Sequence, residues 1–245
     1  MISGAILSPN PYSLFPSPEA FTSYRLTKIT TRTGDEGKTS LADGTRVKKN
    51  SVYMEAIGAV DELNSALGML AARPLAAPVQ ELLRHVQNDL FDVGAELSYP
   101  GYRCLAAAAL ERLDAAIAEL NGRLPPLEEF ILPGGSETGA LCHFVRAVCR
   151  AAERRVVSWQ EANPATTTRT APAGRPATPD QPQQVKSRLA GDPAAKTMSA
   201  GDDLKTPYLN RLSDLLFVLA RSINQADGAT ETRWTAPAAR TKQQG

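Results

Sequence analysis

Apolar residues recur at helical spacing in five segments of this chain, and prolines and glycines separate the segments. In the first segment Val60, Leu63, Leu67 and Leu70 stand three or four residues apart, as on one face of an α-helix. The same spacing predicts helices over about 55–73, 79–99, 110–121, 137–161 and 207–226. The fold expected is therefore all-α, a bundle of five helices preceded by a short extended segment that ends near Thr31.

The fourth helix should divide its residues between two faces. Ser136 is suited to the N-cap, because its hydroxyl can accept a hydrogen bond from the first turn. The core stripe is expected to comprise Leu141, Val145, Val148, Ala152, Val156 and Trp159. The opposite face carries Arg146, Arg150, Glu153 and Arg154. In the fifth helix, one edge carries Asn210, Asp214, Phe217 and Arg221.

The remaining segments are poor in the apolar residues that a core needs. Residues 163–206 hold six prolines and no aromatic residue, and this composition predicts a flexible insertion within one domain. Residues 1–23 are expected to be a disordered extension and 236–245 a disordered tail. The helical domain is thus expected over 24–235, interrupted by the insertion.

Composition narrows the classes of function. The chain has 245 residues, with 27 basic and 26 acidic ones, so no overall charge favours nucleic acid or a membrane surface. No apolar run approaches the roughly 20 residues of a membrane span. Cys142 and Cys149 lie seven residues apart on one expected helix, too far for a disulfide. With no Cys-x-x-Cys or histidine cluster, a protein-held metal is not expected, and a reducing cytoplasm fits best.

The run from Thr31 to Ser40 is nearly a phosphate-binding loop. A Walker loop would need a glycine at position 32, where this chain has Arg32. The run still offers two glycines, several hydroxyl groups and two cations, Arg32 and Lys38, all suited to a polyphosphate. On this segment alone, a phosphate site and an ordinary surface turn are equally plausible.

The arginine face of the fourth helix is a second candidate for binding phosphate. Guanidinium groups can grip phosphate oxygens with two parallel hydrogen bonds. The alternative is a solvated face whose ion pairs contribute only a few tenths of a kcal/mol each. Both readings stay open for this helix taken alone.

Five sequence blocks, taken together, resemble the PduO-type ATP:cob(I)alamin adenosyltransferases. They are Thr31–Gly37, Glu55–Asn64, Phe130–Gly135, the pattern Arg146-x-x-x-Arg150-x-x-Glu153-Arg154, and Tyr208–Asp214. The blocks stand in the family's order across most of the expected domain. The resemblance implies a five-helix bundle that assembles as a homotrimer, with each active site between two subunits.

The resemblance also implies the reaction and the residues that serve it. The family transfers the 5′-deoxyadenosyl group of ATP to the cobalt of cob(I)alamin and releases triphosphate, with Mg²⁺ present. ATP contacts would fall on Thr31, Arg32, Thr33, Gly34, Asp35, Gly37, Lys38, Thr39, Ser40, Lys49, Arg150, Glu153, Arg154 and Asn210. Catalytic roles would fall on Arg150, Asp61, Arg146, Phe130 and Asp214.

Within that set the resemblance gives some residues particular roles. Phe130 would pack beneath the corrin ring, whereas composition alone would favour a core phenylalanine. Asp61 and Arg146 would form an ion pair between subunits. Since cob(I)alamin is itself a strong nucleophile, the site needs no general base, and His85 and His143 are expected to be packing residues.

Two other functions are compatible with the same residues. One is a corrinoid carrier or nucleotide sensor that binds without turnover. The other is a kinase that uses Gly37-Lys38-Thr39. For the transferase, a reductase and an adenosylcobalamin-dependent mutase are possible partners.

Overall fold

A computed structural model describes residue 30 and residues 32–164 and 203–235 of the chain. Its helices are α1 (Val52–Ala71), α2 (Ala77–Ser98), α3 (Ala107–Asn121), α4 (Glu137–Ala162) and α7 (Lys205–Ala226). The all-α fold with five helices is thereby confirmed. The expectations for residues 1–23, Thr31, most of the 163–206 insertion and 236–245 fall outside the described residues.

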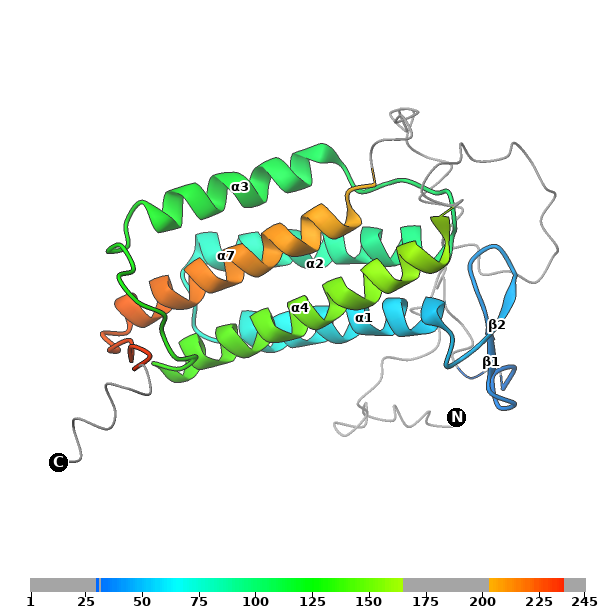
Figure 1. Ribbon diagram of the computed structural model, residues 1–245, viewed down its shortest axis with the longest axis horizontal. Helices are drawn as coiled ribbons and strands as arrows, with labels where there is room; N and C mark the ends of the chain where they lie inside the picture. Colours follow the sequence, from blue (N-terminus) through cyan, green and yellow to red (C-terminus); the bar gives the residue numbers. More distant parts are fainter. Residues whose placement is uncertain (1–29, 31, 165–202, 236–245) are drawn as a thin grey trace, which may run out of the picture.

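The helices lie lengthwise beside one another, with α4 between α1 and α7 (Figure 1). α2 packs on α1, and α3 packs on α7. The core is built mainly from leucine and valine side chains of all five helices, with Trp159 near one end. Burying one such side chain contributes about 1.5–3 kcal/mol, so this shared core holds the bundle together.

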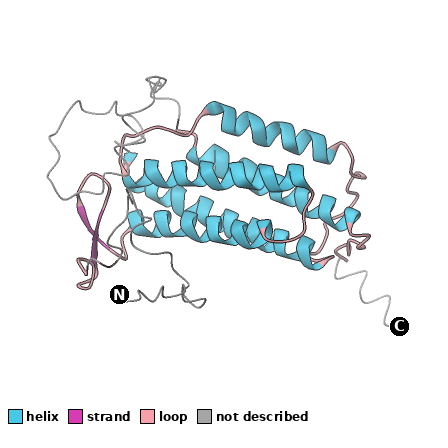
Figure 2. Ribbon diagram, turned by 180° about the vertical axis from the view of Figure 1, so that it is seen from behind, coloured by secondary structure: helices cyan, strands magenta, loops and turns pink. Residues whose placement is uncertain are grey.

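A two-stranded hairpin stands past one end of the bundle (Figure 2). Strand β1 (Lys38–Ser40) pairs antiparallel with β2 (Arg46–Lys48). The sequence of this region predicts only loop and turn, because strands of three residues are too short to show an alternating pattern. Leu41 is buried, and the Ala42 N–H donates to the Ser98 carbonyl at 3.0 Å, so the hairpin is fixed to the end of α2.

The predicted cap of α4 is present. The Gly139 N–H donates to the Ser136 hydroxyl at 3.0 Å, and Asn224 of α7 accepts from the Ser136 N–H at 3.0 Å. Gly135 has φ of +103°, and a Cβ on Gly139 would lie 1.9 Å from the Asn224 Oδ1. Glycine is therefore required at both positions for α7 to approach the start of α4.

The core stripe of α4 is largely as expected. Ala152, Val156 and Trp159 are buried, whereas Val148 is only half-buried. On α7 the expected edge is split, because Asn210 and Asp214 are exposed but Arg221 is 4% exposed. The Arg221 guanidinium donates to Glu231 and to the Pro125 carbonyl, so it holds the end of the bundle together.

Candidate functional site

An open groove of about 450 Å³ runs along the C-terminal half of α4. Its lining residues are Arg150, Glu153, Arg154, Val157 and Ser158. They stand three, four, seven and eight residues apart, so helical geometry alone aligns them on one face. Arg150, Glu153 and Arg154 thus share one face, as expected from their spacing, whereas Arg146 of the predicted face does not line the groove.

The groove presents two guanidinium groups to solvent. Arg154 donates to the Arg150 carbonyl at 2.9 Å, whereas the Arg150 side chain has no hydrogen bond or ion pair with any described residue. An exposed guanidinium without a protein partner keeps all its donors for a ligand such as a phosphate. The groove is therefore suited to an anion that can take two parallel hydrogen bonds.

Helix α7 adds an amide to this groove. The Asn210 Nδ2 donates to the Glu153 Oε1 at 3.3 Å, so residues that lie far apart in the sequence meet at one place. Arg211 instead faces Asp114 at 2.6 Å, with Asp214 at 4.0 Å. The structure thus brings Arg150, Glu153, Arg154 and Asn210 together, and it leaves Asp214 exposed beside them on α7.

The glycine loop before the hairpin closes on itself. The Gly37 N–H donates to the Gly34 carbonyl at 3.2 Å, and the Lys49 N–H donates to the Gly37 carbonyl at 2.9 Å. A Cβ on Gly34 would lie 3.0 Å from the Lys49 Nζ, so the lysine ammonium lies directly against the loop. The Arg46 guanidinium, from β2, donates to the Thr33 carbonyl at 2.8 Å and so fixes the start of the loop to the hairpin.

Two residues of this loop have left-handed backbone conformations. Gly37 has φ of +74°, and Arg32 has φ of +59°. Such a conformation costs a non-glycine residue about 1–3 kcal/mol and is concentrated at functional sites. The loop presents Arg32 and Lys49 as exposed cations. The hydroxyl groups beside them are exposed or half-buried. The other members of the predicted set in this loop are Thr33, Gly34, Asp35, Lys38, Thr39 and Ser40.

The hairpin that follows the glycine loop and the segment between α3 and α4, which contains Phe130, lie at opposite ends of the bundle (Figure 1). Phe130 is 79% exposed, which excludes the alternative of a core phenylalanine. Its carbonyl accepts from the Trp234 N–H at 2.7 Å, next to the bridge between Ile131 and Arg233. Short backbone contacts thus hold Phe130 in place while its ring faces outward.

Asp61 and Arg146 form no ion pair within the described part of this chain. Asp61 is exposed on α1, and Arg146 is half-buried on α4 with its guanidinium 6.0 Å from the Phe217 ring centroid. The pairing of Asp61 with Arg146 across a subunit boundary stays a prediction.

Several polar side chains of the helices are buried. His143 is 3% exposed, and neither of its ring nitrogens has a hydrogen-bond partner among the described residues. Burial, with a smaller effect of Arg146, lowers the pKa of its imidazole. Asp89 and Glu96 are also buried, and their position within the apolar face of the second helix was the signal that could have found them.

The described residues contain no group of three or more His, Cys, Asp and Glu that could hold a metal. They also contain no helix long and apolar enough to cross a membrane. An Mg²⁺ ion would therefore have to draw most of its ligands from a bound phosphate and water, as this ion commonly does.

Comparison with known proteins gives a consistent picture. The family model described as cobalamin adenosyltransferase matches residues 29–173. A cobalamin adenosyltransferase from Cupriavidus metallidurans is 46% identical over 211 residues, which cover 86% of this chain and 95% of that protein. A corrinoid adenosyltransferase from Mycobacterium tuberculosis is 37% identical over 210 residues, covering 81% of this chain and 90% of that protein.

A solved structure shows the same fold. It is a variant of a PduO-type ATP:corrinoid adenosyltransferase from Lactobacillus reuteri, complexed with cobalamin and ATP. Its TM-score is 0.64 at 24% sequence identity, and the match covers 85% of this chain and all of that one.

Proposed function

This chain belongs to the cobalamin adenosyltransferase family, and from that premise we propose that it transfers the 5′-deoxyadenosyl group of ATP to the cobalt of cob(I)alamin. The observation that carries the proposal is the groove in which Arg150, Glu153, Arg154 and Asn210 meet. Those residues belong to two of the sequence blocks that resemble the family, and they form an anion site with an unpaired guanidinium.

The reaction is a nucleophilic displacement at the ribose C5′. The cobalt of cob(I)alamin supplies the electron pair of the new Co–C5′ bond, while the C5′–O bond breaks and its electrons leave with triphosphate. No proton has to be removed in this step, so the reaction needs no general base. The protein has to position C5′ in line with cobalt and stabilise the leaving group.

The described cations are suited to the second task. Arg150 can hold phosphate oxygens with two hydrogen bonds, and Arg32 and Lys49 can add charge from the glycine loop. Mg²⁺ would enter bound to the phosphates of ATP. Glu153 accepts from Asn210 and leaves the guanidinium of Arg150 for the ligand.

We further propose a homotrimer in which two subunits complete each site. The hairpin with the glycine loop stands past the end of the bundle at which α4 finishes, whereas Arg150 lies twelve residues before that end of α4, about 18 Å along the helix. A loop from one subunit could cover the groove of its neighbour. An ion pair between Asp61 of one subunit and Arg146 of the next would fix their alignment.

Phe130 is proposed to face the corrin ring. A ring exposed to this degree is free to pack against an apolar partner, and a flat macrocycle would provide one. Packed beneath the corrin, it would keep the lower axial ligand off cobalt and favour reduction to cob(I)alamin. A reductase in the cytoplasm that supplies this state and a mutase that uses the product are the partners that such a reaction calls for.

The test compares Arg150→Ala with Arg155→Ala in an assay with ATP and cob(I)alamin. Both arginines are on α4, but Arg155 pairs with Glu55 at 3.5 Å and does not line the groove. We expect Arg150→Ala to lower kcat/KM by about 100-fold or more, because a donor to the leaving group is lost. Arg155→Ala should change it less than about threefold.

The product identifies the reaction class. Adenosylcobalamin and triphosphate should form in equal amounts. Binding without triphosphate would indicate a carrier or sensor, and transfer of the γ-phosphate to an acceptor would indicate a kinase. Equal activity of the two arginine variants would remove Arg150 from the site.

A further inference from the structure

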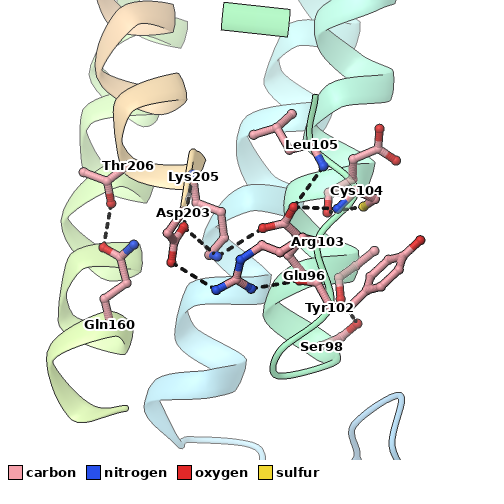
Figure 3. Close-up of polar contacts among 12 residues, drawn as sticks. Glu96, Ser98, Tyr102, Arg103, Cys104, Leu105, Gln160, Asp203, Lys205 and Thr206 are labelled. Carbon is pink, nitrogen blue, oxygen red and sulfur yellow. Dashed lines mark hydrogen bonds and ion pairs between the residues drawn. The ribbon is translucent and has the colours of Figure 1, made fainter. Parts of the chain in front are cut away.

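A buried ion cluster lies at the N-terminal end of α7 (Figure 3). Lys205 is the first residue of this helix, and its side chain is fully buried. Its Nζ lies 2.7 Å from the Asp203 Oδ1 and 3.1 Å from the Glu96 Oε2. The ammonium also lies 5.4 Å from the centroid of the Trp159 ring. One lysine therefore joins α7 to α2 through the interior of the protein.

Glu96 extends the cluster to the segment that follows α2. Its second oxygen, Oε1, accepts from the backbone N–H of Cys104 at 2.8 Å and of Leu105 at 2.9 Å. Arg103 in the same segment reaches the Asp203 Oδ2 at 3.7 Å. Because both carboxylate oxygens of Glu96 are engaged, its position and that of Lys205 are mutually fixed.

Asp89, a second buried carboxylate of α2, contacts the same first turn of α7. The Tyr208 hydroxyl donates to the Asp89 Oδ2 at 2.9 Å, and Asp89 is also paired with Arg112. Asp89 and Glu96 are two helical turns apart on one face of α2. On the α4 side, the Thr206 hydroxyl donates to the Gln160 Oε1 at 2.7 Å. The first turn of α7 is thus bound on two sides.

This first turn leads directly into the proposed nucleotide site. Asn210, which donates to Glu153 in the groove, is five residues after Lys205, about 7.5 Å along the helix. A helix transmits the position of its first turn to the next. We propose that Lys205 is a positioning residue, which with Glu96 and Asp203 sets where Asn210 lies against the Arg150 groove.

Stability alone does not explain a charged cluster at this place. Removing charges from water is costly, and well-packed apolar residues often replace a buried ion pair without loss of stability. A lysine between two carboxylates, however, satisfies all three groups in only one arrangement of the helices. The cluster therefore specifies geometry, and this inference rests on the proposed function for its consequence in catalysis.

The first test is Lys205→Met, with Arg221→Met as its matched control. Both remove a buried cation of α7 that is paired with a carboxylate, but Arg221 is at the opposite end of the helix. We expect Lys205→Met to raise the KM for ATP about tenfold, since Asn210 moves relative to the groove. Arg221→Met should lower the melting temperature and leave this KM unchanged.

The second test separates position from stability. The double variant Lys205→Met/Glu96→Gln leaves one fewer unpaired buried charge than Lys205→Met alone. A glutamine oxygen at position 96 can still accept from the backbone N–H groups of Cys104 and Leu105. We expect its melting temperature to recover by several degrees while its KM for ATP stays raised. A KM that returns to the wild-type value together with the melting temperature would overturn the positioning role.

Hydrogen exchange tests, without reference to activity, whether Lys205 fixes the first turn of α7. Amides over 206–212 should exchange faster in both Lys205 variants than in the wild type and in Arg221→Met. Unchanged exchange rates in the Lys205 variants would overturn the claim that Lys205 fixes the start of α7. A wild-type protein that forms no adenosylcobalamin would refute the proposed function, and the exchange result would still decide whether Lys205 fixes α7.

Discussion

Cys142 and Cys149 show how position within a helix sets the chemistry of a residue. Both thiols are fully buried, and each donates to a carbonyl of α7, that of Leu216 for Cys142 and that of Leu209 for Cys149. Burial raises the pKa of Cys142 to about 12, against a smaller lowering effect of Arg146. Burial also raises the pKa of Cys149. Neither thiol is activated for nucleophilic chemistry.

Thiol labelling checks this environment. At pH 8 a thiol with a pKa near 12 is ionised to about one part in ten thousand, so Cys142 and Cys149 should not react with an aromatic disulfide reagent. Cys104, which is partly exposed, should react alone in the folded protein, and all three should react in denaturant. Rapid labelling of more than one thiol in the native state would contradict the buried positions.

His143 predicts a pH dependence of stability. Its folded-state pKa is lowered from 6.5, chiefly by burial, so below pH 6.5 the unfolded chain binds a proton that the folded protein does not. Stability should therefore fall as the pH drops from 6.5 toward the folded-state pKa, at up to about 1.4 kcal/mol per pH unit.

Replacement of His143 by leucine should remove this part of the pH profile. Urea denaturation of His143→Leu and wild type between pH 5 and 7 measures the difference. The variant should gain stability relative to the wild type at the acidic end. Parallel profiles would show that His143 titrates normally.

At the scale of elements, the junction between α4 and α7 depends on one amide. Asn224 is 1% exposed; it donates to the Gly134 carbonyl at 3.0 Å and accepts from the Ser136 N–H. We expect Asn224→Ala to destabilise the protein by about 2–3 kcal/mol, because buried backbone groups lose their partner.

Ser136→Ala is the matched comparison. It removes the side-chain cap of α4 and the longer hydrogen bond, 3.3 Å, from the Ser136 hydroxyl to the Asn224 Oδ1, and it should cost about 1 kcal/mol. Denaturant unfolding of both variants distinguishes the effects. Equal losses would mean that the amide of Asn224 adds nothing to the cap.

At the scale of the whole molecule, the candidate site has parts at separate places on one bundle. The groove lies on α4, the hairpin with the glycine loop lies past one end of the bundle, and the segment between α3 and α4 that contains Phe130 lies at the other end. This separation is why we expect a second copy of the chain to complete each site.

A charge exchange tests the proposed trimer. Asp61→Arg should place like charges opposite each other at the interface and cost several kcal/mol of association free energy. Adding Arg146→Asp should restore the trimer. Sedimentation velocity measures the oligomeric state of the single and the double variant. Glu62→Arg, at an exposed position on the same helix, is the control. An Asp61→Arg protein that sediments like the wild type would remove this pair from the interface.

The helices of this protein could be read from local patterns. Period and capping are properties of neighbouring residues, so the breaks near Pro74 and Gly122 and the cap at Ser136 could be placed within a few residues. The charged face of α4 followed from the same period. The resemblance of five blocks then pointed to the family that the comparisons show.

What could not be read from local patterns depends on contacts between remote segments. The hairpin is held by contacts outside its two strands, since Arg46 of β2 donates to the Thr33 carbonyl and Leu41, which follows β1, is buried. Lys205 falls within the segment 163–206 that was predicted to be a flexible insertion, but it begins α7 and is buried beside Glu96, which lies 109 residues away in the sequence. Periodicity alone therefore sufficed for the helices and for most of the charged face of α4. Packing assigned Lys205 and Arg221 to the interior, because burial of a polar group is decided by the partners that folding brings to it.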